Sequence, residues 1–123
     1  MPAAIYNFKA EQGATLFFTV AYASTTTVGD VVTETPIDIT DYDASMQVRL
    51  TAANTNVILS LTSGVELTIN GAAGTIDGVV AATVLSAIAP LKYVYDLELH
   101  HKTNGTVIRL IQGAFPVSAE VTR

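Results

Sequence analysis

The stretch YVYDLELHHKTNGTVIRLIQGAFPVSAEVTR, residues Tyr93–Arg123, decides the fold. Its first half alternates apolar and polar residues, and one face of the predicted strand collects Tyr93, Tyr95, Leu97 and Leu99. Period-2 alternation is typical of a β-strand with one buried face. The strand is followed by Lys102–Gly105, which contains the Asn-Gly pair favoured in tight hairpins. The stretch therefore predicts an antiparallel hairpin.

The return part of this stretch predicts two further strands, Thr106–Ile111 and Ala114–Val121, separated at Gln112–Gly113. Together with the strand before the hairpin they form a three-strand meander. Such a meander is a common closing unit of antiparallel all-β domains.

The rest of the chain continues this pattern of short strands. Ala14–Ala23 is rich in β-branched and aromatic residues and predicts a central strand, and Ala44–Leu50 alternates. Ala81–Ala89 is the one helix-like window, about two turns long, and Pro90 ends it. Eight or nine short strands with one short helix predict an all-β fold, an immunoglobulin-like β-sandwich in a single domain of residues 1–123.

Composition narrows the classes of partner. Half of the 123 residues are hydrophobic, only 14% are charged, and the net charge is −5. Surfaces of freely diffusing monomers usually carry about 25% charge or more, so neighbouring subunits are expected to cover part of this one. The negative balance argues against nucleic acid as a partner. No apolar run reaches the roughly 20 residues of a membrane span, the first residues lack a signal-peptide pattern, and cysteine is absent.

A polar, Thr-rich segment, Ser24–Thr35, interrupts the predicted strands. It is long for a connection within a sandwich and is predicted as an extended loop or a flap-like hairpin. Long polar connections commonly carry protein contacts. The candidate contact residues lie at its centre: Val28, Gly29, Asp30, Val31, Val32 and Thr33. The edge strands Ile5–Ala10 and Val117–Arg123 are further candidates for pairing with a neighbouring sheet.

Two clusters invite a metal interpretation. His100 and His101 are adjacent, and neighbouring strand residues point to opposite faces, so both cannot ligate one ion in regular geometry. Symmetry copies in a fibre would be needed to complete a site. Asp38, Asp41 and Asp43 lack the spacing of a calcium loop and are interpreted as turn caps. No metal and no cofactor is predicted.

No catalytic constellation is recognisable. The sequence has no serine in a Gly-x-Ser-x-Gly turn and no glycine-rich phosphate loop, so no enzymatic function is predicted. Aromatic residues are a second candidate surface, because aromatic rings stack on sugars. Their places in the middle of predicted strands favour core packing instead for Phe17, Phe18, Tyr22, Tyr93 and Tyr95.

Three stretches resemble a family of small tailed-bacteriophage virion proteins and the attachment domains that open some baseplate and tail-fibre proteins (baseplate upper protein N-terminal-like). They are FKAEQGATLFFTVAY (Phe8–Tyr22), IDITDYDASMQVR (Ile37–Arg49) and YDLELHHKTNGTVIRLIQGAFPVSAEVTR (Tyr95–Arg123). The last is the most specific, with its Arg-Leu-x-x-Gly strand and its Val-Ser-x-Glu-Val-Thr-Arg ending. Ala119 and Asp41 depart from the family's usual Pro and Gly.

The resemblance implies an immunoglobulin-like sandwich that serves assembly, without catalytic residues. It implies a structural virion protein, a baseplate or tail-fibre adaptor made in the host cytoplasm, which forms homo-oligomers and docks other virion proteins symmetrically. The alternatives are a capsid decoration or cement protein and, from another class, a carbohydrate-binding module for host recognition. Sequence alone leaves the virion partner, the copy number and the symmetry open.

Overall fold

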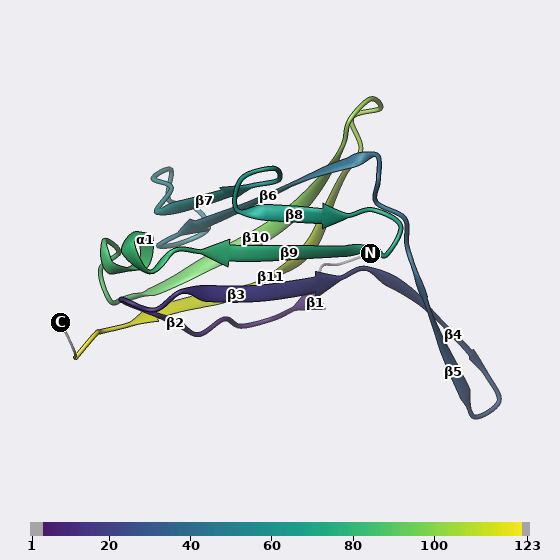
Figure 1. The fold of residues 1–123 in the computed structure, drawn as a ribbon, viewed down its shortest axis with the longest axis horizontal. Coiled ribbons are helices and arrows are strands. Elements are labelled where there is room, and N and C mark those ends of the chain that lie inside the picture. The colour runs from purple at the N-terminus through teal and green to yellow at the C-terminus, as the bar shows by residue number, and fades with distance from the viewer. Residues whose placement is uncertain (1–3, 122–123) are drawn as a thin grey trace.

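The computed structural model describes residues 4–121 and is an all-β sandwich with one short helix (Figure 1). The elements in chain order are β1 Ala4–Ile5, β2 Ala10–Glu11, β3 Leu16–Ala21, β4 Ala23–Val28, β5 Val31–Pro36, β6 Tyr42–Arg49, β7 Leu59–Thr62, β8 Leu67–Asn70, β9 Thr75–Val80, α1 Ala82–Ser86, β10 Lys92–His101 and β11 Val107–Ser118. No helix in this described part is long and apolar enough to cross a membrane.

Two sheets form the sandwich, and their strand orders confirm the predicted immunoglobulin-like class. The larger sheet has the order β1-β11-β10-β6-β7, with β2 also paired to β11, and the smaller has the order β3-β9-β8. In an immunoglobulin sandwich the strands B, E and D share one sheet, and C, F and G share the other. Here β3, β9 and β8 correspond to strands B, E and D, and β6, β10 and β11 correspond to strands C, F and G.

The core lies between the two sheets and follows from strand alternation. In β10 the side chains predicted for one face are all buried, and they are Tyr93, Tyr95, Leu97 and Leu99. An aromatic cluster surrounds Phe8, whose ring centroid lies 5.0 Å from Phe18, 4.8 Å from Tyr95 and 5.5 Å from Phe115. Phe8 thereby joins the first segment of the chain to both sheets.

A tyrosine corner closes the end of the sandwich that carries α1. Immunoglobulin-like folds often have a tyrosine near the start of strand F whose hydroxyl bonds to backbone a few residues upstream. Tyr93, at the start of β10, donates such a bond of 2.8 Å to the carbonyl oxygen of Ala89. Leu85 and Ile88 are buried beneath this turn. The helix predicted over Ala81–Ala89 is confirmed, although it is shorter.

The predicted meander is wrong, because β11 is one continuous strand from Val107 to Ser118. Its pairing with β10 shifts by one residue between Leu97 and Glu98, which places a β-bulge at Leu110, while Gln112 and Gly113 pair in register with Asp96 and Tyr95. The carbonyl oxygen of Tyr6 approaches the backbone of Gly113 so closely that a Cβ there would clash, which accounts for a glycine within the strand.

The prediction of a central strand at Ala14–Ala23 is also wrong, because β3 lies at an edge of the smaller sheet. Alternation places Phe18 against the core and turns Phe17 outward, where its side chain is 75% exposed. Two adjacent strand residues cannot face the same side, so the core-packing prediction fails for Phe17. The other four aromatic residues named with it are buried or packed against the core.

Candidate functional site

The predicted contact segment forms a separate two-stranded hairpin, β4–β5, and confirms the flap-like alternative. Val28 pairs with Val31, so Gly29 and Asp30 form a two-residue turn. Gly29 has a φ of 60°, and among the described residues only glycines have a positive φ, so Asp30 does not. Glycine at the first central position of such a turn is typical of type II′, whose twist matches that of the strands.

The hairpin extends away from the sandwich (Figure 1). Every residue of both strands is exposed, and the side chains of Val28, Val31 and Val32 are 73%, 64% and 62% exposed. A two-stranded hairpin without a packed face is marginally stable in water. Clustered apolar side chains on an exposed element often mark an interaction site. The hairpin tip is therefore the strongest candidate for protein contact.

The base of the hairpin is tied to the sandwich by backbone hydrogen bonds. The amide of Tyr22 donates to the carbonyl of Gly74 at 2.7 Å, and the amide of Ile37 donates to the carbonyl of Tyr22 at 2.9 Å. Gly74 has a φ of 68°, and a Cβ there would meet backbone atoms of both Tyr22 and Ile37. This close packing sets the direction of the hairpin while leaving its tip free.

The structure brings together at this tip all six residues that the sequence predicted: Val28, Gly29, Asp30, Val31, Val32 and Thr33. The two edge-strand candidates fare differently. Ile5–Ala10 lies along the outer edge of the larger sheet, where β1 and β2 pair parallel with β11. Of the predicted Val117–Arg123, Val117 and Ser118 pair with β2 and offer no free edge, β11 ends at Ser118, and residues 122–123 lie outside the described residues.

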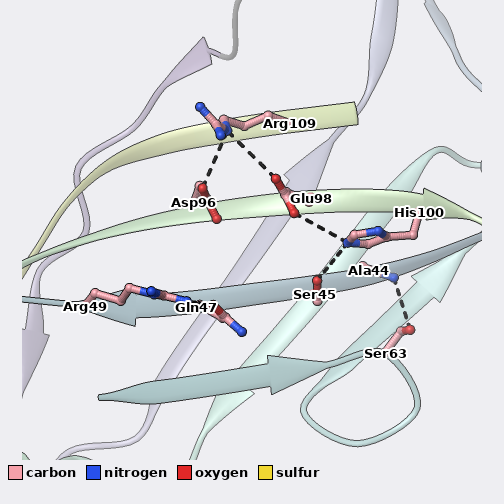
Figure 2. Close-up of polar contacts among 9 residues, drawn as sticks. All are labelled: Ala44, Ser45, Gln47, Arg49, Ser63, Asp96, Glu98, His100 and Arg109. Carbon is pink, nitrogen blue, oxygen red and sulfur yellow. Dashed lines mark hydrogen bonds and ion pairs between the residues drawn. The ribbon is translucent and has the colours of Figure 1, made fainter. Parts of the chain in front are cut away.

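A polar face that the sequence argument missed covers the outside of the larger sheet (Figure 2). Arg109 Nε lies 3.5 Å from Asp96 Oδ2 and 4.0 Å from Glu98 Oε2. His100 Nε2 lies 3.5 Å from Glu98 Oε1 and 3.1 Å from Ser45 Oγ. The sequence did contain a signal for this face. Asp96, Glu98 and His100 alternate with the buried residues of β10, so they lie together on its outer side.

A shallow groove of about 640 Å³ lies over this polar face and includes Gln47, Arg49, Asp96 and Gln112 in its lining. Arg49 donates through its terminal nitrogens to Gln47 Oε1 at 2.8 Å and to the carbonyl oxygen of Asn54 at 2.7 Å. The exposed ion pairs of Arg109 on this face contribute about 0–1 kcal/mol each. The groove is thus a hydrogen-bonding surface that suits a polar partner, and its side chains already engage one another.

The histidines serve different partners. His100 points to the polar face, whereas the ring of His101 packs edge-on against Tyr42 and its Nδ1 accepts from the amides of Thr103 and Asn104 at 3.2 Å. His101 thus caps the hairpin turn. No group of three or more potential metal ligands gathers within residues 4–121.

The aspartates predicted as turn caps also separate. Asp38 accepts from the hydroxyl of Thr40 and, at 2.8 Å, from the amide of Thr40, and these two bonds, the hydroxyl first, lower the pKa of the Asp38 carboxyl. Asp43 Oδ1 lies 3.4 Å from Ser63 Oγ, and the carbonyl of Asp41 accepts from the amide of Lys102. Capping is therefore shown for Asp38, whose side chain closes a local turn.

A third surface lies where three chain segments meet, and we call it the end cleft. It has a volume of about 530 Å³ and is lined by Lys9, Ala10, Glu11, Pro90, Leu91, Lys92, Pro116, Val117 and Ser118. Leu91 is 51% exposed, while Ala10 and Val117 form a buried floor. The segments are distant in sequence, so no local pattern marks this surface.

No protein-family model matches the chain, and a search of curated proteins gives no match. The assignment of function therefore depends on the geometry of these surfaces and on the motifs of the sequence.

Proposed function

We propose that the chain is a structural virion protein of a tailed phage, an adaptor of the baseplate or the tail-fibre root, which docks other virion proteins through hairpin β4–β5. Its mechanism is symmetric, multivalent docking, in which several modest contacts together make a stable joint. The proposal assigns no catalysis, metal or cofactor to the chain.

One observation carries this proposal: a Thr- and Val-rich hairpin stands clear of the sandwich with all twelve strand residues exposed (Figure 1). Burial of apolar surface contributes about 25 cal/mol per Å², so the tip valines would gain stability in an interface. The backbone contacts of Gly74 hold the base of the hairpin, so the ordering entropy lost on docking is confined to the tip.

The resemblance to phage attachment domains supports the same function. Phe8–Tyr22 includes β2 and β3, and Tyr95–Arg123 includes most of β10 and all of β11, so the resembling motifs are framework strands of both sheets. The hairpin lies between the first two resembling motifs. A shared framework with a variable projecting element is a usual arrangement in modules that bind different partners.

The main alternative, a capsid decoration protein, would use the same hairpin at a different place in the virion. A carbohydrate-binding module would use the groove over the polar face, where Gln47, Arg49 and Asp96 offer donors and acceptors. One experiment separates these functions. A capsid decoration protein would lie on the head instead of the tail, and a carbohydrate-binding module would not need the hairpin.

The test is a trimmed variant in which residues 25–34 are replaced by Asn-Gly, so that Ser24 and Thr35, which already pair, flank a new tight turn. A phage lacking its own copy is complemented with wild type, the trimmed variant or Val65→Thr. Val65 is an exposed valine of the turn between β7 and β8, so this variant is the matched control.

We expect the trimmed protein to melt like wild type, because no residue of the removed segment is buried. Purified particles should contain far fewer copies of it, while Val65→Thr is incorporated normally. Immunogold labelling of wild-type particles should mark the tail. Normal incorporation of the trimmed variant would refute docking through the hairpin, and labelling over the head would favour the capsid alternative.

A further inference from the structure

The end cleft has the character of a receptor for an apolar segment with negative charge. Its floor and wall are apolar, with Leu91 standing beside the buried Val117. Lys9 and Lys92 are exposed in its lining, and Glu11 is the acidic residue among the described residues that line it. Among residues 4–121 neither lysine forms an ion pair.

The tip of the hairpin has the complementary character. Val28, Val31 and Val32 give it three exposed apolar side chains, and Asp30 occupies its turn. Glu34 adds a second negative charge on β5, and the hairpin strands and turn carry no lysine or arginine. Apolar side chains flanked by negative charge thus match an apolar cleft flanked by positive charge.

The two surfaces lie at opposite ends of the molecule (Figure 1). The hairpin continues from the end of β3, whereas the end cleft lies at the other end, where α1 leads into β10 and β11 finishes. A chain cannot place its own hairpin tip in its own cleft. A second copy can, because each copy offers one tip and one cleft.

We propose that the hairpin tip of one copy docks into the end cleft of the next, so that the chain associates head to tail with copies of itself. This inference rests on the proposed function of the hairpin and names its partner as a second copy of this chain. Valine side chains of the tip contact Leu91 and Val117, while Asp30 approaches Lys9 and Lys92.

Head-to-tail contacts are heterologous, and they form a ring when the rotation between copies closes and a filament when it does not. The hairpin leaves the sandwich at an angle to β3 (Figure 1). A closed ring is the form that the symmetric joint of the proposed function requires.

The first test uses disulfide trapping, which the absence of cysteine makes clean. Val31→Cys and a tagged Leu91→Cys are mixed in equal amounts under mild oxidation, and Val65→Cys replaces each partner in turn as the control. We expect the 31–91 disulfide to form many-fold faster than any pair that contains Cys at position 65. Formation of 31–31 dimers instead would overturn the head-to-tail geometry, because it would indicate a contact between two tips.

The second test is a charge exchange measured by sedimentation velocity over a range of concentrations. Wild type should increase in mass with concentration, and Asp30→Lys or Lys92→Glu alone should weaken association several-fold. A mixture of the two variants should restore association, because each lysine tip then meets a glutamate-bearing cleft.

The outcomes separate this inference from the function on which it rests. If the 31–91 disulfide forms no faster than the controls and wild type stays monomeric throughout, self-docking is refuted. When the trimmed variant is also lost from particles, hairpin docking stands and the partner is another virion protein. Normal incorporation of the trimmed variant alongside efficient 31–91 trapping would refute docking of the hairpin to other virion proteins but support self-association.

Discussion

The phenolic oxygen of Tyr95 donates a hydrogen bond of 2.6 Å to the carbonyl oxygen of Tyr6, 89 positions earlier in the chain. The bond crosses from the central strand β10 to the first segment of the chain, which lies at the sheet edge beside β11. Gly113 permits this approach, because any side chain there would meet the same carbonyl. One hydroxyl thus fastens the start of the chain to the core.

Tyr95→Phe should lower the free energy of unfolding by about 1–2 kcal/mol, because it leaves the carbonyl of Tyr6 without its phenolic donor. Urea denaturation followed by circular dichroism measures the change. Tyr6→Phe is the control, since the Tyr6 phenol is exposed and the ring contact with Phe8 is kept. Equal stability of Tyr95→Phe and wild type would contradict a structural role for this bond.

The same residue predicts a dependence on alkaline pH. Burial raises the pKa of the Tyr95 phenol, and the nearby Tyr6 phenol adds to the effect. Because the folded-state pKa exceeds the unfolded one, this contribution is complete below about pH 10 and is lost as pH rises above it. Denaturation between about pH 9 and pH 11 should show a shallower loss for Tyr95→Phe than for wild type. Equal loss of stability with pH in the two proteins would contradict the raised pKa of Tyr95.

The tyrosine corner predicts a second stability effect. Tyr93→Phe removes the 2.8 Å bond to the carbonyl of Ala89 and should cost about 0.5–1.5 kcal/mol. Tyr42→Phe is the matched control, because it keeps the ring that packs against His101. Thermal melting of both variants measures the difference, and a Tyr93 variant as stable as the Tyr42 variant would show that the corner is dispensable.

Two glycines should respond to alanine for different reasons. Gly78 lies in β9 under the ring of Phe18, which a Cβ would strike, so Gly78→Ala should cost about 1–3 kcal/mol by displacing the ring. Gly105 has open space but a φ of 76°, so Gly105→Ala should cost about 1 kcal/mol from backbone strain alone. In a Phe18→Leu background the cost of Gly78→Ala should fall, whereas the cost of Gly105→Ala should stay the same. Urea denaturation of the single and double variants measures both costs.

An acid dependence is expected from Asp77. Hydrogen bonds from Thr19 first, and then from Asn70, lower the pKa of the Asp77 carboxyl. A lowered folded-state pKa means that the contribution is present above the ordinary pKa and is lost as pH falls through the lowered one. Asp77→Asn should therefore lose less stability on acidification than wild type. Urea denaturation of both proteins at a series of acidic pH values measures the difference, and parallel curves would contradict this contribution.

Much of the framework could be predicted from sequence because its signals are local. The alternation of β10 and the Asn104–Gly105 turn need only neighbouring residues, since strand geometry sends successive side chains to opposite faces. The hairpin tip at Val28–Thr33 was also predictable, as a polar interruption with a Gly-Asp turn. Its free projection was not, because that depends on the packing of Gly74 at its base.

Long-range packing decided what the sequence could not. Gln112–Gly113 has the residues of a turn, yet it continues β11, because both residues pair with β10 and Gln112 also pairs with Ile5 of β1. Phe17 is a residue type that is usually buried, yet the register of β3 with β9 turns its side chain outward. The end cleft joins residues 9–11, 90–92 and 116–118, and only the tertiary fold brings those segments together.

The sequence by itself determined the all-β class, the hairpin at Asn104–Gly105 and the exposed segment centred on Val28–Thr33. Each depends on periodicity or turn chemistry within about ten residues. The tertiary structure alone decided the continuity of β11, the polar face around Arg109 and the end cleft around Leu91. Those features depend on strand register and on which distant segments meet, and both are settled by the packing of the whole chain.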